Sequence, residues 1–168
     1  MRAPNQINFS KRLLMPDLGI PGFAKVLTLA LSLVFSCSAL ALDFRSVVPA
    51  KAVLYDAPSK EANKLYILSA GYPVEIIVNL GDWLKVRDQQ GGLSWIESKQ
   101  LSAKRTVLVI ENTEIKSAEN ASAPLLATVE KDVTLEMLSP IIKNGWVKVK
   151  HRDGIIGFVQ ASALWGAS

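Results

Sequence analysis

Residues 83–96 read WLKVRDQQGGLSWI, and residues 146–159 read WVKVKHRDGIIGFV. Each segment starts with tryptophan, alternates apolar and polar residues, passes through a glycine-containing turn and ends on an aromatic residue followed by an aliphatic one. Alternation with a period of two predicts a half-buried strand, and a glycine turn between two such runs predicts a β-hairpin. We therefore expect two copies of one small β module.

The similarity between the copies extends beyond these hairpins. Residues 48–76 align with residues 109–137 at an offset of 61, and residues 83–101 align with residues 146–164 at an offset of 63. A single two-residue insertion within 141–144 accounts for the difference. The aligned apolar pairs include Val48 with Val109, Leu54 with Ile115, Leu68 with Val129, Val74 with Leu135 and Leu101 with Leu164. A period of roughly 60 residues indicates a duplicated compact domain and not a solenoid.

Each copy is expected to be all-β. Five or so short strands separated by glycine, proline and asparagine predict a small closed barrel, with a single helical turn at Ser98–Leu101. We place the domains at residues 42–103 and 104–168. Domains of this size bury only about 60% of their unfolded surface, so we expect them to dock. Leu164-Trp165 would cover an exposed edge or the joint.

The chain carries a formal charge of +4, but the excess belongs to its first 41 residues. That segment holds four basic residues and one acidic residue, whereas the remainder holds fifteen basic and fourteen acidic residues spread evenly. A protein that tracks phosphates needs clustered Lys and Arg on its folded part. The sequence therefore predicts no nucleic-acid partner.

Residues 1–41 have the order of a secretory signal peptide. A polar, net-basic segment precedes the apolar core at 26–35, and Ala39-Leu40-Ala41 supplies small residues at both positions that signal peptidase reads. We expect cleavage after Ala41 and a periplasmic or secreted protein. The alternative is an uncleaved inner-membrane anchor, because the uncharged run 26–42 reaches the minimum length for crossing a bilayer.

Two further points about this segment stay open. Val34-Phe35-Ser36-Cys37 loosely resembles a lipobox, so lipidation at Cys37 is a second route to the membrane. Translation starts at Met1 or at Met15. Cys37 is the only cysteine, so the rest of the chain can form neither a disulfide nor a cysteine zinc site.

The two copies resemble the bacterial SH3 domain, SH3b. The resemblance covers nearly all of residues 44–165. In the second copy it is carried by Gly145-Trp146-Val147-Lys148-Val149, Asp153-Gly154, Gly157-Phe158-Val159 and Leu164. In the first copy it is carried by Gly81-Asp82-Trp83-Leu84-Lys85-Val86, Gly91, Trp95-Ile96 and Leu101.

The resemblance implies two tandem SH3-like barrels in an exported protein that binds peptidoglycan or an envelope peptide. Both copies depart from the family in one loop. Where the family often carries Asn-Val-Arg-x-Gly-Pro, the first copy has Leu54-Tyr55-Asp56-Ala57-Pro58 and the second has Ile115-Lys116-Ser117-Ala118-Glu119. The alternative role is a structural or assembly subunit that contacts another envelope protein. Oligomeric state is open.

We expect no catalysis, metal or cofactor. His151-Arg152-Asp153 has the letters of a kinase catalytic loop, but it falls in a hairpin turn with no phosphate loop nearby. His151 is the only histidine, and no cysteine lies outside the leader. Cell-wall hydrolases and transpeptidases that carry this domain need a separate catalytic domain, for which the chain has no room.

Ligand binding is expected on aromatic residues. Strand alternation sends Leu84 and Val86 to the core and Trp83 to the rim. In the first module Tyr55, Tyr66, Trp83 and Trp95 would line a groove beside the acidic and basic loop 56–64, and this groove would hold an extended peptide or stack on sugar rings. The second module matches them with Lys116, Ala127, Trp146 and Phe158. We expect the first module to bind and the second to support it, unless both tryptophans only pack the barrel ends.

Overall fold

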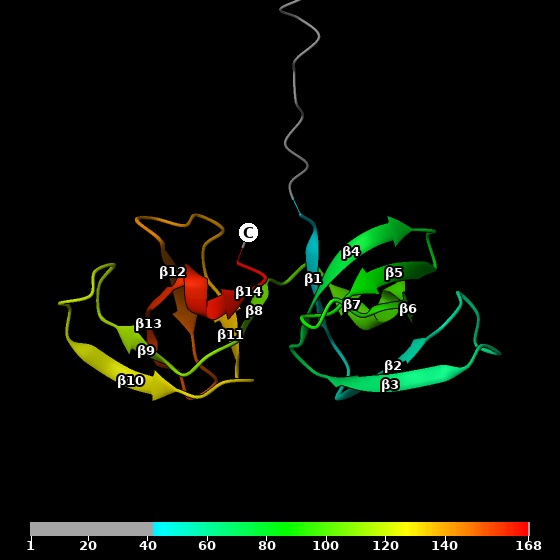
Figure 1. The fold of residues 1–168 in the computed structure, drawn as a ribbon, viewed down its shortest axis with the longest axis horizontal. Coiled ribbons are helices and arrows are strands. Elements are labelled where there is room, and N and C mark those ends of the chain that lie inside the picture. Colours follow the sequence, from blue (N-terminus) through cyan, green and yellow to red (C-terminus); the bar gives the residue numbers. More distant parts are fainter. Residues whose placement is uncertain (1–41, 168) are drawn as a thin grey trace, which may run out of the picture. The chain divides into compact units, whose positions relative to one another are not determined.

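The computed structural model describes residues 42–167, which form two antiparallel sheets of seven strands each (Figure 1). Within this range there is no α-helix, only two short 3-10 turns. The all-β prediction is therefore confirmed, and the helical turn predicted after the first hairpin is present as η1, Ser98–Gln100. The proposed leader, with its cleavage site and Cys37, lies outside the described residues.

The first sheet has the order β3-β2-β6-β5-β4-β1-β7. The sheet has more strands than the five expected, because the short strands β1 and β7 are added at one end of it. Its strands are β1 (Phe44–Val47), β2 (Lys51–Tyr55), β3 (Lys64–Ser69), β4 (Pro73–Asn79), β5 (Trp83–Arg87), β6 (Leu93–Glu97) and β7 (Leu101–Ser102).

The second sheet repeats this topology in the order β10-β9-β13-β12-β11-β8-β14. A 3-10 turn, η2 (Ala161–Ala163), again precedes the last strand. The strands are β8 (Thr106–Val109), β9 (Thr113–Lys116), β10 (Leu125–Val129), β11 (Thr134–Met137), β12 (Trp146–Lys150), β13 (Ile156–Gln160) and β14 (Leu164–Trp165).

One detail of the predicted alignment is wrong. Val109 corresponds to Val47 and not to Val48, because Val47 pairs with Leu101 just as Val109 pairs with Leu164. Val47 is buried, whereas Val48 is exposed. The turn that follows the first strand is one residue longer in the first copy, a difference that two adjacent valines conceal in the sequence.

Each sheet encloses its own apolar core, as strand alternation requires. In β5, the side chains of Leu84 and Val86 are fully buried, while those of Trp83 and Lys85 point away from the core on the opposite face of the strand. Full burial of one such aliphatic side chain contributes about 1.5–3 kcal/mol. The first core contains Val47, Ala52, Leu54, Leu68, Val74, Leu84, Val86, Ile96 and Leu101. The second contains Val107, Val109, Ile115, Val129, Leu135, Met137, Val147, Val149, Val159, Ala163, Leu164 and Ala167.

The two modules dock, as their small cores led us to expect. Trp165 of the second module packs edge-on against Phe44 of the first, with ring centroids 5.1 Å apart at 85°. The guanidinium of Arg105 lies 5.5 Å from the Phe44 ring and donates to the carbonyl oxygen of Gly166 at 2.8 Å. Trp165 thus covers the joint, one of the two placements predicted for it.

Candidate functional site

Three of the four predicted aromatic residues meet on the outer surface of the first sheet. Tyr55 on β2 lies opposite Trp95 on β6, and the rings of Tyr55 and Trp83 pack edge-on with centroids 5.4 Å apart. Lys85 on β5 lies opposite Trp95 and places its Nζ 5.9 Å from the ring centroid. We call Tyr55, Trp83 and Trp95 the aromatic face. Of these three residues, Tyr55 is buried, while the two tryptophans are half-buried.

Tyr66 does not belong to this surface. It pairs with Leu54, which points into the core, so Tyr66 leaves the sheet on the side opposite to Tyr55. Its hydroxyl group donates to Oδ2 of Asp88 at 2.8 Å and lies 3.2 Å from Oγ of Ser94. Partial burial raises the pKa of this phenol above its usual value. The predicted groove of four aromatic residues is therefore reduced to three.

Next to the aromatic face is a pocket of about 320 Å³, which we call the Trp83 pocket. The loop between β2 and β3, the β4–β5 turn and η1 meet around it. Its lining residues are Lys60, Asp82, Trp83, Glu97, Ser98 and Lys99.

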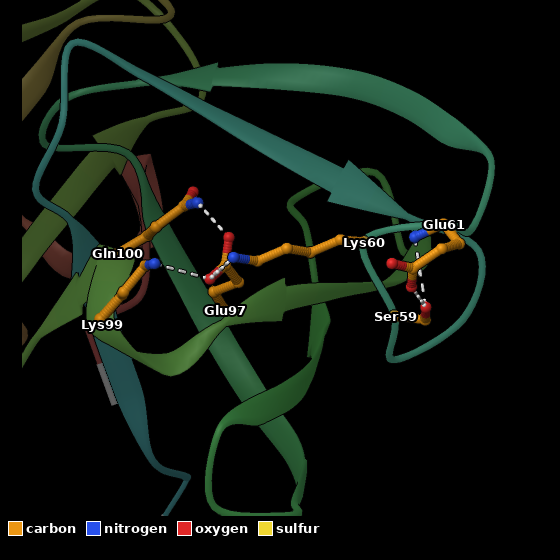
Figure 2. A network of polar contacts seen from close by, with 6 residues as sticks. All are labelled: Ser59, Lys60, Glu61, Glu97, Lys99 and Gln100. Atoms are coloured by element: carbon orange, nitrogen blue, oxygen red, sulfur yellow. Dashed lines mark hydrogen bonds and ion pairs between the residues drawn. The ribbon is translucent and has the colours of Figure 1, made fainter.

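Glu97 is the centre of a polar network in this pocket (Figure 2). Its Oε2 atom lies 2.9 Å from Nζ of Lys99 and 3.7 Å from Nζ of Lys60, and its Oε1 accepts from Nε2 of Gln100 at 3.4 Å. Lys60 reaches Glu97 from the neighbouring loop, where Ser59 donates to Glu61. The network therefore connects the loop 56–63 to the end of β6.

The charges of this network reinforce one another. The hydrogen bond from Lys99, followed by the charges of Lys60 and Lys99, holds the pKa of Glu97 below its usual value against the opposing effect of burial. The same hydrogen bond raises the pKa of Lys99. Both groups are therefore ionised near neutral pH. The Glu97 side chain is 15% exposed, while those of Lys60 and Lys99 are 63% and 70% exposed.

The second module carries a different pocket at the corresponding place. Trp146 is only 8% exposed, and Nζ of Lys148 lies 6.0 Å from the Phe158 ring. Lys116, opposite Phe158, occupies the place of Tyr55 and pairs with Glu114 at 2.6 Å. The pocket measures about 270 Å³ and is lined by Asn112, Thr113, Glu114, Lys116, Ala121, Trp146 and Gln160.

A larger hollow of about 560 Å³ lies at the joint between the modules. Its main charged groups already satisfy each other, since Arg87 donates through Nε and Nη2 to the two carboxylate oxygens of buried Glu75 at 2.8 Å. Its aromatic residues, Phe44 and Trp165, pack on one another. The Trp83 pocket is the stronger candidate because its cations are exposed and its tryptophan is accessible.

His151 contacts Asp153 at 3.2 Å in an exposed turn. The described part of the chain contains no group of three or more His, Cys, Asp and Glu residues placed to hold a metal ion. Between residues 42 and 167 there is also no helix with the length and hydropathy needed to span a membrane.

The model of the bacterial SH3 domain matches residues 48–103 and 118–166. The chain belongs to the bacterial SH3 domain family. The first matched segment covers β2 to β7 of the first sheet, and the second covers β10 to β14 of the second sheet, so the tandem SH3-like arrangement inferred from the repeat is confirmed. Among curated proteins, no sequence is detectably similar to this chain.

Two solved structures from Trichomonas vaginalis resemble this chain at low similarity. They are the structures of NlpC2, with 16% identity over 76% of this chain and 49% of that one, and NlpC1, with 18% identity over 77% and 47%. Both have a TM-score of 0.35. The chain thus spans about half the length of each.

Sequence reasoning found the aromatic residues of the site and the charged loop 56–64 beside them, but it singled out none of the charged residues of the pocket. Lys60, Glu97 and Lys99 lie on a loop, a strand end and a 3-10 turn, where charged residues are usually solvated and carry no periodic signal. One signal was present in the comparison of the two copies. At the three corresponding positions the second copy has Ala121, Gln160 and Ser162, none of which is charged.

Proposed function

We propose that the protein is an exported, non-catalytic binding protein whose first module holds peptidoglycan in the cell envelope. The observation that carries this proposal is the aromatic face. Trp83 and Trp95 are half-buried on the strands β5 and β6 beside a polar pocket, an arrangement that suits stacking on sugar rings or packing along an extended peptide.

The second module supports the first in this proposal. Trp146 is almost fully buried and Lys116 replaces the tyrosine of the aromatic face, so less aromatic surface is left for a ligand. Membership of the bacterial SH3 domain family agrees with a role in binding wall components. Export through residues 1–41, with release into the periplasm or beyond the cell, belongs to the same proposal.

The test is co-sedimentation of the purified protein, expressed from the full-length chain, with insoluble peptidoglycan sacculi. We expect the wild-type protein to sediment and Trp83→Ala to remain in the supernatant at both low and high salt, because stacking is not screened by ions. Trp146→Ala should sediment when folded. Equal loss in both variants would contradict the division of roles, and no sedimentation of the wild type would favour an envelope protein as the partner.

A further inference from the structure

The polar groups around Trp83 contain more hydrogen-bond donors than the pocket uses. Glu97 accepts hydrogen bonds from Lys99 and Gln100 and forms an ion pair with Lys60 at 3.7 Å, so both of its oxygens are engaged (Figure 2). Each lysine ammonium has three N–H groups, of which the contact with Glu97 occupies one. The pocket therefore offers a ligand several open donors around a carboxylate that is already engaged.

The exposure of Glu97, Lys60 and Lys99 also favours ligand binding. Glu97 is recessed, whereas the two lysine side chains that meet it are mostly exposed. A carboxylate fixed between two flexible cations restricts where their ammonium groups lie. It thus holds Lys60 and Lys99 beside the Trp83 ring before any ligand arrives, which lowers the ordering cost of binding.

The site also holds cations that an anionic group could contact. The Trp83 pocket is lined by two lysines, Lys60 and Lys99, and by two acidic residues, Asp82 and Glu97. Lys85, which lies beside the Trp95 ring, adds a third cation next to the aromatic face. Asp82 lies at the exposed β4–β5 turn, and its backbone carbonyl accepts from the N–H group of Ser98 at 2.8 Å.

We propose that Lys60 and Lys99 bind a carboxylate group of the ligand that lies on Trp83, with Glu97 positioning the two ammonium groups. This inference rests on the proposed function and specifies the class of ligand: a wall peptide or sugar that bears a free carboxylate. An incoming carboxylate accepts from the open N–H groups of both lysines without breaking their contacts to Glu97.

The second module lacks this recognition. Ala121, Gln160 and Ser162 stand where the first module has Lys60, Glu97 and Lys99, so its pocket can offer amide and hydroxyl groups but no pair of ammonium groups. Carboxylate selectivity is therefore a property of the first module alone, although the two modules share one fold.

The experiment compares native sacculi with sacculi whose carboxylates have been converted to methylamides by carbodiimide coupling. The proteins are the wild type, Lys60→Ala/Lys99→Ala and a matched control, Lys51→Ala/Lys131→Ala. The control removes the same charge from two exposed lysines that line no pocket at the site. Trp83→Ala is the reference for loss of the aromatic contact.

We expect amidation to weaken wild-type and control binding about two- to tenfold, the range of one or two exposed ionic contacts. Lys60→Ala/Lys99→Ala should bind native sacculi as weakly as the wild type binds amidated sacculi, and amidation should then change nothing further. Added salt should reduce the preference for native sacculi.

Three outcomes would overturn the inference. Equal wild-type binding to native and amidated sacculi would exclude carboxylate recognition and leave the proposed function intact. Equal losses in the matched control would show that net charge, and not these two lysines, is responsible. No wild-type binding to native sacculi would reject the proposed function, and this inference with it.

Discussion

The side-chain oxygens of Ser46 and Thr106 lie 2.6 Å apart, although the two residues are separated by 60 positions and belong to different sheets. Ser46 also contacts the carbonyl oxygen of Lys104 at 2.6 Å, and Thr106 contacts that of Gly71 at 2.7 Å. The hydroxyl groups of Ser46 and Thr106 thus have two protons for three short oxygen–oxygen contacts, and both residues are buried. This polar chain, together with Trp165 on Phe44, joins the modules into one unit.

Replacing Thr106 by valine keeps the shape of the side chain and removes the hydroxyl. The carbonyl oxygen of Gly71 then loses its buried donor, so we expect a loss of about 1–3 kcal/mol in the free energy of unfolding. Urea denaturation measures it. Thr128→Val on the exposed part of β10 is the control. A change at Thr106 no larger than the control would show that the joint contributes nothing to stability.

Gly166 and Gly154 both adopt a left-handed backbone conformation, each with φ of +89°. A Cβ atom at Gly166 would lie 3.4 Å from the carbonyl oxygen of Thr106 and 3.5 Å from Phe44, which is ordinary van der Waals contact, and one at Gly154 would meet nothing within 4 Å. Gly154→Ala and Gly166→Ala should therefore each cost only the backbone strain of about 1–2 kcal/mol. Thermal denaturation of the two variants checks this, and a clearly lower midpoint for Gly166→Ala would contradict it.

Trp83 and Trp146 should differ in their contribution to the stability of the protein as well as to binding. Trp146 is 8% exposed, whereas Trp83 is half-buried. Trp146→Ala should cost about 3–5 kcal/mol, the range for a core aromatic residue, and Trp83→Ala clearly less. Calorimetry of both variants checks this. A larger loss for Trp83→Ala would identify Trp83 as a structural cap and weaken its proposed role in binding.

Tyr66 should matter for stability and not for the ligand. Tyr66→Phe removes the hydroxyl contacts with Asp88 and Ser94, for which we expect a loss of about 0.5–1.5 kcal/mol. Co-sedimentation with sacculi should be unchanged, because the ring lies on the core side of β3. Impaired binding by a normally stable variant would return Tyr66 to the site.

The contribution of Glu97 to stability should depend on pH. Since its pKa is lowered in the folded state, that contribution is complete above the usual value of 4.5 and is lost as pH falls through the lower folded value. The difference in melting temperature between the wild type and Glu97→Gln should therefore stay constant from neutral pH to about 4.5 and shrink in more acidic solution. A difference that shrinks only at alkaline pH would contradict the assignment.

The duplicated hairpins were readable from the sequence because a strand's alternation is a local property. Leu84 and Val86 lie in the core and Trp83 on the outside, as their order along the strand requires. The offset between the copies was read correctly for most strands. It failed at Val48, where neighbouring valines fit either register and only the pairing partner separates them.

The composition of the site depended on contacts that no local pattern encodes. Its aromatic ring predicts a place for Tyr66 in the groove, but pairing with Leu54 turns this side chain toward the core side of the sheet. Lys60 and Glu97 are 37 positions apart, and only the return of the β2–β3 loop over the end of β6 brings them together. Loop conformation follows from packing across the whole domain, so the sequence did not reveal this pair.

By itself, the sequence determined the class of fold, the duplication and the placement of core residues, since hydrophobic periodicity and glycine turns act over a few residues. The tertiary structure alone decided which side chains share a surface. Strand pairing across the sheet separates Tyr66 from the other aromatic residues, gathers Lys60, Glu97 and Lys99 around Trp83, and joins Ser46 to Thr106. These contacts link positions distant in the chain, where burial and register across the whole domain determine the geometry.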